Sequence, residues 1–136
     1  MSLDAAMVAR GLCDLTPKAG SIVLIENVGN LVCPALFDPG ERAKVVLFSV
    51  TGGEDKPLKY PDMFRAARVI VINKVDLLPH VDFSLETAIA HVRAVNPDAP
   101  VLQLSARTGE GMPSWHAWLE SQAAAAREFT PLCAAP

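Results

Sequence analysis

The chain has 136 residues, 51% of them hydrophobic and 20% charged, a balance that suits one globular domain with a buried core and excludes a disordered chain. Twelve basic and fifteen acidic residues give a net charge of −3 without a Lys/Arg cluster, which argues against a nucleic-acid-binding surface. No apolar run approaches the roughly 20 residues of a membrane span and the chain does not start like a signal peptide, so we expect a cytoplasmic protein without membrane contact.

The first half of the chain predicts a helix followed by two buried strands. Apolar residues at helical spacing predict an amphipathic helix over residues 2–15. Short apolar runs predict strands at 21–26 and 44–50, each ending in a loop that contains glycine. Three cysteines, Cys13, Cys33 and Cys133, are odd in number and widely spaced, which argues against a disulfide framework.

The second half alternates helices and strands. The pattern predicts helices at 59–67, 84–95 and 112–127, strands at 69–73 and 100–104, a loop at 105–111 and a frayed tail at 128–136. Strands that alternate with helices imply βαβ units, so the predicted fold class is α/β, with a mainly parallel sheet flanked by helices.

The strand at 69–73 ends in Asn73-Lys74-Val75-Asp76, a sequence that can recognise guanine. Open α/β sheets bind ligands at the carboxyl ends of their strands, where this segment would lie. The Asp76 carboxylate can accept hydrogen bonds from the ring N–H and the amine of guanine, the Lys74 stem can cover the base, and Asn73 can fix the neighbouring loop. A solvated loop start is the competing interpretation, because a four-residue pattern is common.

Polar or glycine residues follow the other predicted strands as well. Glu26 and Gly29 follow the first strand and can hold water on Mg²⁺ and approach a terminal phosphate, although a strand end and turn glycine would also account for them. Ser105, Ala106 and Arg107 follow the last strand and can present backbone N–H groups to the guanine carbonyl. Because parallel strands end at one edge, we expect these loops to converge.

In this order the motifs resemble those of the P-loop GTPases. The longer segments 25–34, 55–61 and 73–79 resemble the hydrogenase nickel-incorporation GTPase family, and the resemblance extends from Leu3 to about Trp118. It implies a truncated SIMIBI-type GTPase domain over residues 1–127 that binds GTP or GDP with Mg²⁺ and supports nickel delivery to hydrogenase precursors. The urease accessory GTPases are similar at Asn73 to Asp76 and form the alternative.

The chain lacks the phosphate-binding sequence Gly-x-x-x-x-Gly-Lys-Ser/Thr, which that family carries upstream. Its backbone N–H groups and lysine provide most of the phosphate binding and the stabilisation of phosphoryl transfer. We therefore expect negligible GTP hydrolysis by this chain and assign it no catalytic residue. A non-catalytic binding or dimerisation module is the second hypothesis.

The resemblance also implies an intersubunit nickel or zinc site and a nucleotide-dependent homodimer. A Cys-His pair that precedes Leu3 in the family is absent here, so Cys33 is the one remaining candidate ligand and we expect weak metal binding. Lys56 is placed by the resemblance near the dimer interface, where it can reach a partner's nucleotide. The expected partners are the hydrogenase precursor and other nickel-delivery accessory proteins.

Overall fold

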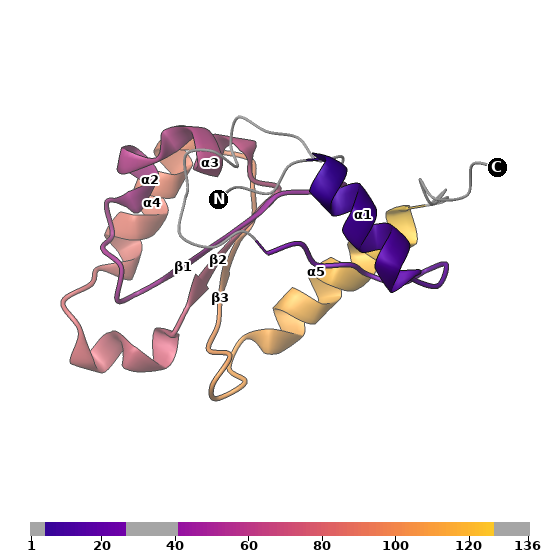
Figure 1. The fold of residues 1–136 in the computed structure, drawn as a ribbon. Coiled ribbons are helices and arrows are strands. Elements are labelled where there is room, and N and C mark those ends of the chain that lie inside the picture. The colour runs from indigo at the N-terminus through magenta and orange to yellow at the C-terminus, as the bar shows by residue number, and fades with distance from the viewer. Residues whose placement is uncertain (1–4, 27–40, 127–136) are drawn as a thin grey trace.

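The structure is a computed structural model that describes residues 5–26 and 41–126. Its three strands form a parallel sheet in the order β1-β2-β3, which confirms the predicted α/β class. The elements are the strands β1 (Val45–Ser49), β2 (Val69–Asn73) and β3 (Val101–Gln103), the helices α1 (Ala5–Leu15), α2 (Lys56–Lys59), α3 (Pro61–Ala66), α4 (Leu85–Val95) and α5 (Met112–Ala125), and a 3-10 helix (Val75–His80). Helices α2, α3 and α4 gather on one side of the sheet, whereas α1 and α5 lie on the other (Figure 1).

The core lies between the sheet and the helices α3 and α4. Strand β2 is central, with Val71 opposite Leu47 of β1 and opposite Leu102 of β3. Its four apolar residues are all buried, as expected of a parallel strand covered on both faces. The buried cluster on the helical side consists of Val46, Phe48, Val50, Met63, Phe64, Ala67, Ile70, Ile72, Ala88, Val92 and Ala99.

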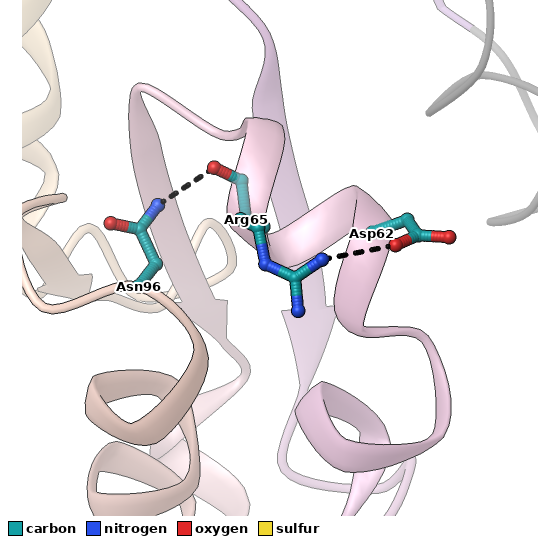
Figure 2. Close-up of polar contacts among 3 residues, drawn as sticks. All are labelled: Asp62, Arg65 and Asn96. Atoms are coloured by element: carbon teal, nitrogen blue, oxygen red, sulfur yellow. Dashed lines mark hydrogen bonds and ion pairs between the residues drawn. The ribbon is translucent and has the colours of Figure 1, made fainter.

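Asn96 joins the end of α4 to the end of α3. Its buried side-chain amide donates to the carbonyl oxygens of Phe64 and Ala67 at 2.9 and 3.0 Å, and its Oδ1 accepts from the N–H of Ala99 at 3.0 Å. Figure 2 shows the longer contact to the carbonyl of Arg65, whose guanidinium pairs with Asp62 on the exposed side of α3. Asn96, which directly follows the helix predicted at 84–95, therefore satisfies backbone groups that the core removes from water.

The predicted strand at 21–26 is wrong. Residues 21–26 have no regular secondary structure, and Leu24 is 70% exposed. A buried strand needs hydrogen-bonding neighbours, and the described sheet places no strand beside this segment. The apolar, β-branched composition was a sound strand signal, but strand formation depends on a pairing partner that composition does not encode.

Other differences are local. The helix expected at 59–67 begins earlier and divides into α2 and α3 at Tyr60, because Pro61 has no N–H to continue the first helix. The 3-10 helix Val75–His80 was not predicted. Cys13 is disulfide-bonded, against the expectation from the cysteine count.

Strand β1 forms one edge of the described sheet. Lys44 O accepts from Arg68 and Val50 N donates to Asn73, so the alternate positions of β1 face β2 and the others face outward. Leu47, in the middle of the strand, is 60% exposed while its two neighbours are buried. The part of the chain that the structure describes places no strand against this outer side.

Among residues 5–26 and 41–126, none of the helices combines the length and the apolar character that crossing a bilayer requires.

Candidate functional site

The segment Asn73-Lys74-Val75-Asp76 turns sharply at the carboxyl end of β2. Lys74 has left-handed backbone angles (φ 63°, ψ 34°), which are uncommon for a residue with a side chain. Asn73 Oδ1 stabilises this turn by accepting from the N–H of Lys74 at 2.7 Å. The turn directs the chain into the 3-10 helix, so that Asp76 lies in its first turn and Lys74 is exposed.

Asp76 is held by the loop that follows β3. Ser105 Oγ donates to Asp76 Oδ1 at 2.7 Å, and the same Oγ accepts from the N–H of Thr108 at 3.1 Å. Asn73 Oδ1 accepts a second hydrogen bond from the N–H of Ala106 at 3.1 Å. The ends of β2 and β3 therefore meet in these two hydrogen bonds, which join residues 29 and 33 positions apart in the sequence. The side chains of Asn73 and Asp76 accept both of them.

The loop at 105–111 is closed by its own backbone. Ser105 N donates to the carbonyl of Glu110, and Gly109 N donates to the carbonyl of Ser105, both at 2.8 Å. Gly111 has a positive φ of 74°, and a Cβ at this position would overlap the carbonyl oxygen of Gln103. The loop therefore presents Ser105 in one orientation, fully buried beneath Asp76.

The loop after β1 reaches the same edge of the sheet. Val50 N donates to the carbonyl of Asn73 at 3.2 Å, so the end of β1 is bonded to the start of the Asn-Lys-x-Asp segment. Lys56 follows this loop and is half-buried at the start of α2. The loop also contains Glu54, which sequence reasoning missed although it contacts α4. Glu54 lies in the sequence Gly-Gly-Glu-Asp, which is typical of an exposed turn, so the sequence does not show whether its carboxylate forms a contact or is solvated.

The remaining predicted site residues are not brought together by the described structure. Glu26 is exposed at the end of the described segment 5–26, and not at a strand end as expected. Gly29 and Cys33 lie outside the described residues. Arg107 is exposed on the loop after β3, and no group of three or more His, Cys, Asp or Glu side chains within 5–26 and 41–126 is arranged to hold a metal ion.

The assembled part of the site is an acceptor for N–H donors. An ionised carboxylate has about four acceptor positions, of which the Ser105 hydroxyl occupies one. Asp76 is half-buried, so its carboxylate favours a ligand that places an N–H donor opposite it and disfavours a ligand that places an acceptor there. The exposed Lys74 has a four-carbon stem that can cover a flat ligand lying against the carboxylate.

Comparison with known proteins shows which family the chain resembles. The sequence profile of the family described as "CobW/HypB/UreG, nucleotide-binding domain" matches residues 2–103. The hydrogenase maturation factor HypB of Azotobacter vinelandii is 60% identical over 120 residues, which are 88% of this chain and 40% of that protein. The chain thus spans 40% of the length of this relative.

Two crystal structures share the fold. That of hydrogenase maturation factor HypB from Archaeoglobus fulgidus has a TM-score of 0.81 and 41% identity, covering 88% of this chain and 63% of that one. That of HypB from Helicobacter pylori in complex with nickel has a TM-score of 0.82 and 31% identity, covering 95% and 62%. Together with the profile match, these similarities show that the chain belongs to the CobW/HypB/UreG nucleotide-binding family and, within it, resembles the HypB hydrogenase maturation GTPases.

Proposed function

We propose that this chain contributes the base-recognition part of a GTP-binding protein that supports nickel insertion during hydrogenase maturation. The observation that carries the proposal is the hydrogen bond between Ser105 Oγ and Asp76 Oδ1, made beside the pairing of Asn73 with Ala106. These contacts fix a carboxylate at the carboxyl edge of a parallel sheet, the usual ligand-binding edge of such sheets. The role in hydrogenase maturation is proposed from the similarity to the HypB relatives, which are named hydrogenase maturation factors.

The chemistry of Asp76 favours guanine over adenine. Guanine presents its ring N1–H and its exocyclic amine side by side, and both can donate to one carboxylate. Adenine presents an acceptor nitrogen at the corresponding ring position, so its binding would leave the acceptor positions of Asp76 that Ser105 does not fill without a donor. Sites built around such donors discriminate strongly against ligands that lack them.

Hydrolysis of GTP is not proposed for this chain alone. Its 136 residues contain no Gly-x-x-x-x-Gly-Lys-Ser/Thr segment, and a guanine site without a phosphate cradle loses most of its affinity for the nucleotide. We expect turnover near the uncatalysed rate when the purified chain is incubated with GTP and Mg²⁺. Turnover at a rate typical of an intact GTPase acting alone, about 10⁻³ to 10⁻² s⁻¹, would contradict this expectation.

We propose nickel as the cargo of the whole protein, which would deliver it to the hydrogenase precursor together with other accessory proteins. Nucleotide binding would control the formation of a homodimer. Cys33 is the candidate ligand from this chain, and one thiolate per subunit falls short of a four-ligand site. We therefore expect weak nickel or zinc binding. Exchange of Cys33 for Ser should abolish whatever binding a metal titration detects.

A titration with fluorescently labelled GDP, challenged by excess ATP, tests base recognition. We expect weak binding that unlabelled GDP reverses and ATP does not. Asp76→Asn is the informative variant, because its Oδ1 can keep the Ser105 hydrogen bond while its amide now donates where the carboxylate accepted.

Asp76→Asn should weaken GDP binding at least about tenfold, the equivalent of one lost hydrogen bond of 1.4 kcal/mol. Xanthosine diphosphate, which carries a carbonyl in place of the guanine amine, should bind this variant better than GDP does. Equal affinity of the unmodified chain for GDP and ATP would leave the non-catalytic module as the remaining hypothesis.

A further inference from the structure

Glu54 connects the loop after β1 to helix α4 through two separate groups. Its carboxylate oxygen Oε2 accepts from the backbone N–H of Ser84 at 2.6 Å. Its backbone carbonyl lies 2.8 Å from Nδ1 of His91, two turns further along α4. Because a carbonyl oxygen can only accept, Nδ1 of His91 must carry the hydrogen.

The carboxylate contact occurs at a favourable place on α4. Ser84 is the N-cap of this 11-residue helix, and its own Oγ accepts from the N–H of Thr87 at 3.2 Å. A negative charge near a helix start interacts favourably with the exposed N–H groups there. The hydrogen bond to a charged acceptor is also stronger than one between neutral groups. Glu54 is thus held in position and orientation by two contacts on one rigid element.

The start of the loop after β1 is bonded to the base-recognition segment, residues 73–76. Val50 N donates to the carbonyl of Asn73, and Ser49 Oγ lies 2.5 Å from Thr51 Oγ1. Gly52 and Gly53 lie between these contacts and Glu54, and Gly53 has a φ of 90° that favours glycine. Gly52 N donates to the carbonyl of Ser49 at 3.0 Å, so the loop is fixed at both ends and closed by this turn in the middle.

We propose that Glu54 is a positioning residue that holds the loop at 51–55, and with it Lys56, in a fixed position relative to the segment 73–76. Binding of a guanine nucleotide at Asn73 and Asp76 then restrains this loop, because Asn73 anchors one end while α4 anchors the other through Glu54. The mobility of this loop therefore falls when a guanine nucleotide occupies the site at Asn73 and Asp76. This coupling rests on the proposed guanine recognition, whereas the contact of Glu54 with α4 does not.

Amide hydrogen exchange of the full chain, resolved by NMR, tests the positioning role without nucleotide. Glu54→Ala should speed amide exchange at Ser84 about tenfold or more, because Ser84 N loses its acceptor. Exchange at Gly52 should rise by a similar factor, because its hydrogen bond to Ser49 lies in the loop that Glu54 anchors. Glu54→Gln keeps an acceptor oxygen and should restore most of the protection. Glu120→Ala, the same change at an exposed site on α5, should leave both amides unaffected.

The same measurement with GDP tests the coupling. In the unmodified chain GDP should slow exchange at Val75 and Leu77 beside the base and, about threefold or more, at Gly52. In Glu54→Ala the slowing at Val75 and Leu77 should persist while that at Gly52 disappears. His91→Ala should reproduce this loss, because it removes the second contact.

Each possible failure has a separate meaning. Exchange at Ser84 and Gly52 within twofold of the unmodified chain in Glu54→Ala would overturn the positioning role. Equal GDP-dependent slowing of Gly52 with and without Glu54 would overturn the coupling. Absence of slowing at Val75 and Leu77 in the unmodified chain would refute guanine recognition and, with it, the coupling, while the nucleotide-free comparison still decides the role of Glu54.

Discussion

The hydrogen bond between Ser105 and Asp76 should stabilise the fold as well as orient the site. Ser105→Ala removes a single oxygen atom and leaves at most a void of that size, so the loss reports mainly on the hydroxyl and its hydrogen bonds. Ser105 is 0% exposed, which prevents water from replacing its Oγ, and its acceptor is a carboxylate. Hydrogen bonds to charged groups contribute about 1.5 to 3 kcal/mol. The N–H of Thr108 also loses its acceptor in this part-buried contact, which adds to the loss.

We therefore expect Ser105→Ala to lower the free energy of unfolding by about 2 kcal/mol. With a urea m-value of about 2 kcal/mol/M for a small domain, the midpoint of urea unfolding should fall by about 1 M. Far-UV circular dichroism measures this midpoint. Ser114→Ala is the matched control, because Ser114 is exposed on α5 and its hydroxyl makes no hydrogen bond within the described residues.

A free energy of unfolding within about 0.5 kcal/mol of the unmodified chain, the usual scatter of surface substitutions, would refute the reasoning. A second refutation would come from GDP binding. The variant should bind labelled GDP about tenfold more weakly, because its carboxylate is no longer held in one orientation. Unchanged GDP affinity together with the full loss of stability would confine Ser105 to a structural role.

Two further substitutions test the fold that supports the site, each by urea unfolding. Asn96→Ala removes the amide that satisfies backbone carbonyls at the end of α3 and should cost about 3 kcal/mol. Asn96→Asp places an acceptor oxygen and a buried charge against those carbonyls, so it should cost at least as much, and a clearly smaller loss would contradict this account. Gly111→Ala should cost about 3 kcal/mol, because the new Cβ overlaps Gln103 O at a positive φ. Gly109→Ala, with a positive φ but open space, should cost only about 1 kcal/mol, so equal losses would exclude the overlap as the cause.

The sequence predicted the part of the site that depends on strand ends. Asn73 and Ser105 each follow an apolar run, and parallel pairing brings such ends together whatever the details of the loops. The orientation within the site was not predictable in the same way. That Ser105 would donate through its hydroxyl, where backbone N–H groups were expected to act, depends on the closure of the loop by Gly109 and Gly111.

The errors have a common physical origin. Residues 21–26 have the composition of a buried strand, yet a strand exists only where another strand pairs with it, and such a pairing joins distant parts of a chain. Glu54 was missed for a similar reason, since its partners Ser84 and His91 are 30 and 37 residues away. Local patterns report which face of an element is apolar, but not which distant group completes a contact.

The exposed Leu47 has a practical consequence for handling this chain. Within residues 5–26 and 41–126 no strand pairs with the outer side of this neutral Val-Val-Leu-Phe-Ser strand, which is a template on which another chain can add and which contains no charge or proline to prevent this. We expect the soluble yield to fall steeply as protein concentration rises, and to improve when Leu47 is replaced by Lys. The concentration at which light scattering sets in therefore limits the titrations and the NMR measurements before any property of the nucleotide site does.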